Sequence, residues 1–414
     1  MNKMLILVLL AAFNTSTAFS AVMPEEVHED EMTVNPNLSL RDVLEKTIAR
    51  SPQQAILAAQ KYEVLAKQKM ADSTLPLSPS ISVYHQNDTI GSGRNERDWQ
   101  AAIELPIWLP KQKSSREKVA VLSASNLDAN TENLQLEVAG ALRDAVWTIA
   151  LNSNEAALQQ EKLSNAEKLE ADIQRKFQAG ELAKTDLMLV QQETLFARKN
   201  LIRAEAELMH AHYRYTQLTG LNEIPENYEE SKSTLESFEE SSQWKSAQAK
   251  VSLAQSKRDL SAVERRENPH VIFNARSSQG AFDTQYNQSV GVQIRIPLDT
   301  EVRSAPILAA SEQVYGEAIS QRETLSRMLA ADLHEAEHNL LISKKELSLA
   351  EEQFNIAKNS AVLAQKAYNL GELDLMILLR IQSQTFEAEK SYSTRQLQVK
   401  WDTARYNQAV GVLP

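Results

Sequence analysis

The chain has 414 residues, no cysteine, and 55 acidic against 44 basic side chains, which gives a formal net charge of −11. The absence of cysteine excludes disulfides and lipid attachment at an N-terminal cysteine. The acidic balance argues against a protein that binds nucleic acid. Glycine (10) and proline (12) are rare, so few positions favour a helix end, and long uninterrupted helices are expected.

Residues 1–20 have the pattern of a secretory signal peptide. Lys3 supplies positive charge, an apolar run extends from Met4 to Phe13, and Ala18-Phe19-Ser20 fits a small-residue cleavage site. The apolar run is too short to span a bilayer, which favours export and cleavage over a membrane anchor. Residues 21–37 are acidic and contain proline, so they are predicted to form a flexible N-terminal segment. No later run of about 18 apolar residues occurs, so a membrane-spanning part would have to consist of β-strands.

The next part of the chain, residues 38–220, predicts a helix, two strands and a pair of long helices. Ser39 is a candidate N-cap for a helix that ends near Ser73, shortly before two prolines. Apolar and polar residues then alternate in two segments at about 80–107, as in strands joined by a glycine-containing loop. Long helices are predicted within 113–219, with Gly180 as the C-cap at the reversal between them. At 1.5 Å per residue, the first of them measures roughly 100 Å.

The rest of the chain repeats this unit. Residues 106–220 match residues 297–411 at a constant offset of 191 without a gap. A spacing held over more than a hundred residues indicates one structural unit used twice. We therefore expect an acidic linker at 221–242 and a second repeat at 243–414. The second repeat has a helix from Trp244, strands at about 270–297 and long helices within 303–410.

The regular alternation in the four predicted strands is typical of two kinds of sheet. One is a half-buried sheet of a soluble protein; the other is a membrane β-barrel, with apolar side chains toward lipid and polar ones toward a lumen. Four strands are too few to close a membrane barrel, because the smallest has about eight. If these strands span a membrane, several copies of the chain must share one barrel. Helices of roughly 100 Å also indicate a coiled-coil or tubular assembly, since no single globular core can bury them.

The ordered set of these features resembles the TolC-type outer-membrane efflux proteins over nearly the whole mature chain. It comprises the duplicated strand–strand–helix–Gly–helix unit, a proline after each second strand (Pro106 and Pro297), and the tip turns Phe177-x-x-Gly180 and Tyr368-x-x-Gly371. The resemblance implies a fold that is mostly α with a small β part. Three chains would form a homotrimer, in which twelve strands close one outer-membrane β-barrel that a periplasmic α-helical barrel continues.

The same resemblance implies a function and partners. The protein would be a passive exit channel in the outer membrane of a Gram-negative bacterium, surrounded by outer-membrane lipid. It would work with a periplasmic adaptor protein and an inner-membrane pump of the RND type. The moderate length and short N-terminal tail are most similar to the CzcC-like branch, which exports heavy-metal cations. Drugs or type I secretion substrates are the alternative cargo. No cofactor, enzymatic activity or nucleic-acid partner is implied.

In the family, the turns between the long helices form the periplasmic aperture and contact the adaptor. Carried over by position, these tips are Gly180-Glu181-Leu182 and Gly371-Glu372-Leu373. We therefore expect both turns to lie at the end of the molecule that is farthest from the strands.

The residues that would line the aperture depart from the best-known family pattern. Its two acidic places after the second tip correspond here to Ile377 and Arg380, and neither is acidic. Asp186 and Asp374 lie close to the tips and are the other aperture candidates. Three copies of Arg380 near a narrow axis would hinder a cation unless they are paired. The alternative is that Arg380 faces a neighbouring helix and pairs with a carboxylate.

One short motif points to a different chemistry. Residues 334–338 match H-E-x-x-H, in which His334 and His338 lie one turn apart on a helix and can hold zinc, with Glu335 as general base. The motif lies in the middle of a long helix, and no third ligand follows at a familiar spacing. The equivalent residues of the first repeat are Arg143 and Trp147. We therefore predict no catalytic site, and keep His334 and His338 only as weak candidates for transient metal contact.

Two rival functions stay open at this stage. A soluble periplasmic coiled-coil protein with a structural or adaptor role would share the long helices but would not enter a membrane. A zinc peptidase would depend on His334, and alanine substitution with a metal assay tests it.

Overall fold

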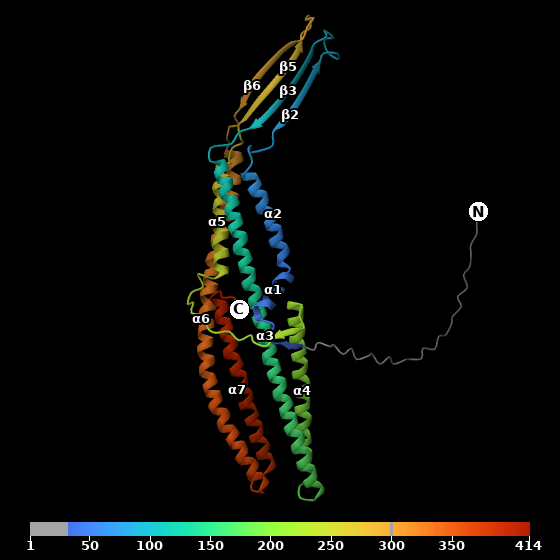
Figure 1. Ribbon diagram of the computed structural model, residues 1–414, viewed down its shortest axis with the longest axis vertical. Coiled ribbons are helices and arrows are strands. Elements are labelled where there is room, and N and C mark those ends of the chain that lie inside the picture. Colours follow the sequence, from blue (N-terminus) through green and yellow to red (C-terminus); the bar gives the residue numbers. More distant parts are fainter. Residues whose placement is uncertain (1–31, 299–300) are drawn as a thin grey trace, which may run out of the picture.

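The computed structural model describes residues 32–298 and 301–414, which form one long, narrow body (Figure 1). The expected signal peptide at 1–20, and residues 21–31 of the expected flexible segment, lie outside the described residues. A sheet forms one end, and two helical hairpins form the other. In chain order the elements are β1 Thr33–Asn35, α1 Leu40–Arg50, α2 Gln53–Ala71, β2 Ser80–Asn87, β3 Arg97–Pro106, α3 Gln112–Gln178, α4 Lys184–Thr219, β4 Glu223–Pro225, α5 Ser242–Val263, β5 His270–Gln279, β6 Asn287–Arg295, α6 Glu301–Asn369 and α7 Leu375–Ala409.

The sheet at one end is antiparallel, with the strand order β2-β3-β5-β6. Its central pair joins the two halves of the sequence, because β3 from the first half pairs with β5 from the second (Figure 1). The outer strands, β2 and β6, have a neighbour on one side only among the described residues. The four strands lie within the two segments in which the sequence predicts alternation.

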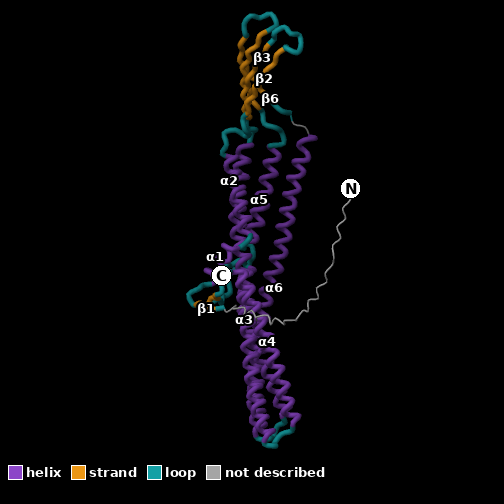
Figure 2. The backbone as a smooth tube through the Cα atoms, turned by 90° about the vertical axis from the view of Figure 1, so that its right-hand side faces the viewer, coloured by secondary structure: helices purple, strands orange, loops and turns teal. Residues whose placement is uncertain are grey.

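The helices lie in a layer below the sheet. α2, α3, α5 and α6 run side by side next to the sheet, while α3 and α6 continue past mid-length and pair with α4 and α7 (Figures 1 and 2). The two long helices were predicted at 113–178 and 303–369, and they begin one or two residues earlier in the structure. None of the helices formed by the described residues is long and apolar enough to cross a lipid bilayer.

The first predicted helix is two helices in the structure. Ser39 is the N-cap of α1 as expected, and forms a capping box with Asp42. α1 ends at Arg50, and its C-cap residue Ser51 leaves the helical conformation (φ −59°, ψ 128°). Pro52 follows, and a residue that precedes proline is disfavoured in the α conformation. The prediction of one helix was therefore wrong at this point, because apolar periodicity continues across the break.

A second sheet at mid-length was not predicted. β1 and β4 form a short parallel pair, with Val34 opposite Ile224. β1 lies in the segment predicted to be flexible, and β4 lies in the predicted linker. Strands of three residues are too short to show alternation, so the sequence carried no signal for them.

The largest hydrophobic cluster surrounds this small sheet. It brings together α1, α3, the end of α4 and β4, with Val43, Leu142 and Tyr215 fully buried. A second cluster lies near the tips and contains Ile173 and Leu187 from the first hairpin and Tyr368 and Leu378 from the second. The body is thus held at mid-length and near the tips, and much of the helical surface between these places is exposed.

Candidate functional site

The four-stranded sheet has one face of exposed apolar side chains. The strand register places Ile81, Ile103, Phe273 and Val292 in one row across all four strands. All four are exposed, Ile81 by 75% and Val292 by 66%. A row of large apolar side chains open to the surroundings on a narrow sheet is suited to lipid or to another apolar partner.

The opposite face of the sheet is polar. Three positions along the strands from the apolar row, a row on this face contains Tyr84, Gln100, Arg276 and Ser289. The Arg276 guanidinium lies 2.8 Å from a carboxylate oxygen of Asp98 on the neighbouring strand. Because side chains alternate along each strand, the two faces differ in polarity over the whole sheet.

At mid-length, a buried arginine joins three parts of the chain. Arg143 of α3 is only 2% exposed and donates two hydrogen bonds to Glu230, at 2.7 and 2.6 Å. It also donates to the side-chain oxygen of Gln408 (2.6 Å) and to the backbone carbonyl of Val412 (2.9 Å). The segment 226–241 and the C-terminus are therefore fixed against α3 by one charged side chain. Sequence patterns did not predict this role for Arg143, which they placed only at the repeat position of His334.

Below Arg143, polar contacts join the two hairpins along α3 and α7. The Trp401 indole Nε1 donates to Asp144 (3.0 Å), Asn154 donates to Ser393 (3.1 Å), and the Lys390 ammonium lies 2.7 Å from Glu155. Together with Arg143 and Gln408, these contacts form what we call the internal joint. It fixes the upper parts of the hairpins relative to each other.

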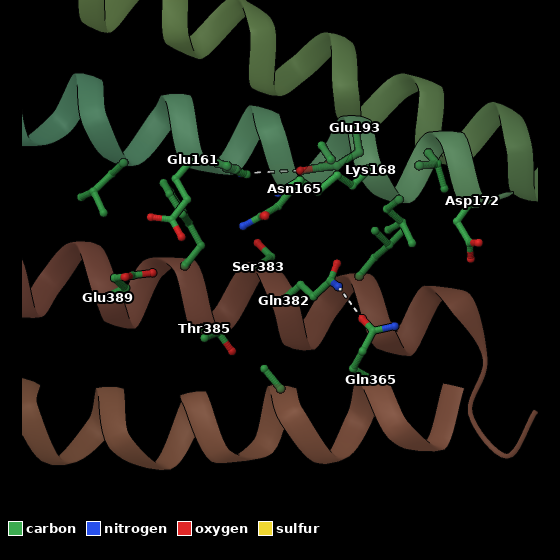
Figure 3. Close-up of a pocket in the computed structure, with 18 of the residues that line it drawn as sticks. Glu161, Asn165, Lys168, Asp172, Glu193, Gln365, Gln382, Ser383, Thr385 and Glu389 are labelled. Atoms are coloured by element: carbon green, nitrogen blue, oxygen red, sulfur yellow. Dashed lines mark hydrogen bonds and ion pairs between the residues drawn. The ribbon is translucent and has the colours of Figure 1, made fainter. Parts of the chain in front are cut away.

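Between the internal joint and the tips, the two hairpins line a cavity of about 540 Å³ that has both polar and apolar side chains in its walls (Figure 3). Figure 3 shows Glu161 and Asn165 of α3 facing Gln382, Ser383 and Glu389 of α7 across it. The Gln382 side-chain amide donates a 3.2 Å hydrogen bond to Gln365, within its own hairpin. The Lys162 ammonium, in contrast, contacts both hairpins. It lies 3.5 Å from Glu193 of the first hairpin and 4.8 Å from the ring centre of Phe386 of the second.

The cavity perturbs one carboxyl group. Burial raises the pKa of Glu389, the negative charge of Glu161 raises it further, and Lys358 partly opposes the shift. Two carboxylates from different hairpins thus weaken the contact between the hairpins when both are ionised. The ionisation of these carboxyl groups is therefore expected to affect the separation of the two hairpins in their lower halves.

Both predicted tip turns lie at the end opposite the sheet, and they have the same geometry. Gly180 and Gly371 have φ of +79° and +77°. The amides of Gly180 and Glu181 bond back to the carbonyls of Phe177 and Lys176, and the second turn repeats this pattern. This is a Schellman motif, which needs a left-handed residue and therefore favours glycine. Glu181 and Glu372 are exposed, while Leu182 and Leu373 pack against the cluster near the tips.

The four aperture candidates differ in their surroundings. Asp374 is the N-cap of α7 and accepts a 2.8 Å hydrogen bond from the amide of Met376, and Asp186 is half-buried in the first turn of α4. Ile377 and Arg380 are exposed. No hydrogen bond or ion pair of Arg380 occurs within the described part of the chain. The suggested pairing of Arg380 with a carboxylate is therefore absent from residues 32–298 and 301–414.

The histidines of the H-E-x-x-H motif are exposed on α6. Their rings are nearly parallel (3°), with centres 6.2 Å apart. Among the residues that the structure describes, no group of three or more His, Cys, Asp or Glu side chains is placed to hold a metal ion. A single chain thus offers two imidazoles here and no third ligand.

Comparisons with known proteins identify the fold. No protein-family profile matches the sequence, and no curated protein matches it significantly. Solved structures do match, although sequence identity is low. The outer membrane protein VceC from Vibrio cholerae superimposes with a TM-score of 0.73 at 12% identity, over 90% of this chain and 96% of that chain.

Two further matches cover nearly the whole chain. The outer membrane channel CmeC from Campylobacter jejuni has a TM-score of 0.70 at 12% identity, over 98% of this chain and 93% of that chain. The open state of the outer membrane channel MtrE from Neisseria gonorrhoeae has a TM-score of 0.64 at 14% identity, over 92% and 91%. The chain therefore has the fold of these outer-membrane channels, mostly α with a small sheet, as the resemblance implied.

Proposed function

We propose that this protein is a TolC-type outer-membrane channel, in which three copies share one barrel and form a passive exit for a tripartite efflux system. The observation that carries the proposal is the sheet: it is narrow, open at β2 and β6, apolar on one face and polar on the other. Sheet edges with unpaired backbone groups cannot face lipid. Pairing β6 of one copy with β2 of the next would satisfy both edges, and three copies would give twelve strands.

The rest of the chain supports the same assembly. The helical layer also has two free edges, formed by α2 and α4 on one side and by α6 on the other (Figures 1 and 2). Exposed apolar side chains lie along α4 and α6, among them Phe196 and Ile202 on α4 and Leu349 and Ile356 on α6. Both edges of a protomer would be covered when copies close into a ring, since such a head-to-tail contact closes by rotation.

In this proposal the tips act as the gate. The periplasmic adaptor contacts the turns at Gly180–Leu182 and Gly371–Leu373, and its binding favours the arrangement in which the hairpins stand apart. This is a shift between two states of the lower hairpins. The inner-membrane pump, of the RND type, supplies the energy and most of the selection. No enzymatic step is involved.

For the cargo we propose heavy-metal cations. The supporting observations are the acidic composition, with a net charge of −11, and the similarity in length to the CzcC-like branch. Drugs and type I secretion substrates are the alternatives. Sensitivity of a deletion strain separates them: loss of resistance to zinc, cobalt or cadmium alone supports cations, whereas sensitivity to detergents and dyes supports a drug channel.

The assembly is tested by fractionation of cells that express the full chain, followed by light scattering of the detergent extract. We expect a detergent-dependent trimer in the outer-membrane fraction. A monomer or dimer in the soluble periplasmic fraction would contradict the shared barrel and favour the coiled-coil protein without membrane insertion.

A further inference from the structure

The helices at the two free edges of the molecule, α6 and α4, are sequence repeats of the two helices that form the internal joint. α6 is the repeat of α3, and α4 is the repeat of α7, at the offset of 191 residues. The internal joint is the contact of α3 with α7. A contact of α6 with α4 of the next copy would therefore repeat the internal joint between chains. This step rests on the proposed ring of copies.

Two charged pairs at the internal joint recur at the free edges. Glu155 and Lys390 form an ion pair in the joint, and their repeat positions hold Glu346 and Lys199. Asp144 lies near Arg405, and their repeat positions hold Glu335 and Arg214. Opposite charges thus stand on the two edges at the places where the joint needs them, which favours a second copy of this chain as the occupant of each edge.

The pair of Asn154 and Ser393 is not repeated, since Lys345 and Ile202 stand there, but three other places change in a consistent way. Three large side chains of α3 and α7 lie in the internal joint or next to it. Each of them has a histidine at its repeat position. Arg143 corresponds to His334, Trp147 to His338, and Trp401 to His210. His334 and His338 lie on α6, and His210 lies on α4, where its side chain is 66% exposed. Chance placement is a weak explanation, since the whole chain contains only 7 histidines.

We propose that His334 and His338 of one copy and His210 of the partner subunit form a binding site for a divalent transition metal of the zinc class. Imidazole nitrogen is a preferred ligand for such ions, and three histidines with an open fourth position are a known zinc set. The site is incomplete in a single chain, which has only the two parallel rings of His334 and His338.

A carboxylate supports the third ligand. In the internal joint, Asp144 accepts the hydrogen bond of the Trp401 indole. Glu335 and the partner subunit's His210 occupy the places equivalent to Asp144 and Trp401. Glu335 therefore accepts a hydrogen bond from one ring nitrogen of that histidine, and the other ring nitrogen is left to bind the metal. Such a carboxylate orients the imidazole and increases its basicity. Arg214 of the partner subunit pairs with the same carboxylate and holds it as an orienting group rather than a ligand.

The ring itself is tested first, because the chain has no cysteine. In the variant with Glu346→Cys and Lys199→Cys, a short bifunctional thiol reagent is expected to join chains into a covalent trimer. The matched control, Glu155→Cys with Lys390→Cys, changes the internal joint and is expected to crosslink only within one chain. If the first variant stays monomeric on a denaturing gel, the ring is wrong, and the proposed channel fails together with the site.

The metal site is tested on the same detergent-solubilised oligomer, after EDTA treatment, by titration with zinc chloride and by zinc content. We expect about one zinc per chain, and an affinity at least about tenfold lower in His210→Ala and in His334→Ala/His338→Ala. His212→Ala, two residues along the same helix, is the control and is expected to bind as the wild type. A covalent trimer that binds no zinc overturns the site alone. So does wild-type affinity in His210→Ala, because zinc would then be held within one chain.

Discussion

α3 and α6 are repeats of one another with similar lengths, yet their environments differ. α3 is central: it contacts α2, α4, α5 and α7. Its buried side chains include the fully buried Leu142 and Trp147. α6 contacts only α5 and α7 at length, and far fewer of its side chains are buried. At the repeat positions of Arg143 and Trp147, α6 carries exposed histidines.

The difference in burial between α3 and α6 shows which helical surfaces are covered within one chain and which are left for contact with another copy. Similar sequences form similar helices, but only the copy in the middle of the layer has partners on both sides. Apolar side chains exposed along the length of a helix indicate a surface that contacts a partner, since large exposed apolar areas usually mark interaction sites. If α6 gains in the assembled protein the neighbours that α3 already has, the comparison predicts where substitutions matter inside one chain and where they matter between chains.

The largest effect is expected at Arg143. Replacement by methionine leaves Glu230, whose side chain is only 12% exposed, without its cation. Loss of one partner of a buried ion pair typically costs about 3–5 kcal/mol. We expect a clear fall in the thermal unfolding midpoint, measured by circular dichroism in detergent with EDTA. His334→Ala is the matched variant on α6. It is expected to change stability by less than about 0.5 kcal/mol, as for an exposed position.

An equal loss in the two variants would break the comparison. An additional Glu230→Gln substitution in the Arg143→Met variant removes the uncompensated charge. It is therefore expected to recover part of the loss, because the two residues act as a pair.

The next effect concerns packing. Leu142 is fully buried in the mid-length cluster, while its repeat, Leu333, is half-buried on α6. Leu142→Ala is expected to cost about 2–5 kcal/mol, from lost apolar burial and the cavity that remains. Leu333→Ala should cost less than half as much. The same thermal measurement compares them, and a larger loss at Leu333 would show that α6 is more fully packed than α3.

The sequence predicted the regular part of the fold well. Rare glycine and proline predicted the long helices, alternation predicted the four strands, and Gly180 and Gly371 predicted the tip turns, which have the expected left-handed geometry. All of these depend on local patterns. The short strands around Val34 and Ile224 and the role of Arg143 depend on segments far apart in the chain, so local patterns carry no signal for them.

The candidate site was predicted in part. The tips lie where the repeat placed them, but the adaptor contact and the aperture role of Asp186, Asp374, Ile377 and Arg380 stay predictions. His334 and His338 were singled out by a motif that names a peptidase. Their repeat positions suggest a different role, and His210 entered the argument only when the internal joint was known in atomic detail.

The tips provide a test in which the two halves should behave alike. Gly180 and Gly371 have positive φ, and no other atom lies within 4 Å of an added Cβ at either position. Alanine at either glycine is therefore strained by its backbone alone, at about 1 kcal/mol. Local opening of the turns, measured by hydrogen exchange of the last helical residues, is expected to increase similarly in both variants. A change at one tip only would mean that the turns have different neighbours in the assembly.

The smallest effect is expected from the carboxyl group of Glu389. Burial and the charge of Glu161 raise its pKa. A carboxyl group with a raised pKa in the folded state binds its proton more tightly there than in the unfolded chain. Its favourable contribution is fully present below the usual glutamate pKa, and is lost as the pH rises through the raised value. The contact between the hairpins should therefore be firmer in mild acid than at neutral pH.

Glu389→Gln removes this titration. The variant is expected to be slightly more stable than the wild type at neutral pH, and the difference should vanish or reverse in mild acid. Spin labels on the two hairpins, one on α3 and one on α7 below the internal joint, report their separation over the same pH range. Glu387→Gln, at an exposed position on the same helix, is the control. A separation that changes equally with pH in both variants would assign the effect to the general charge of the protein. A change that Glu389→Gln alone removes would locate the proton-sensitive contact in the cavity between the hairpins, below the internal joint.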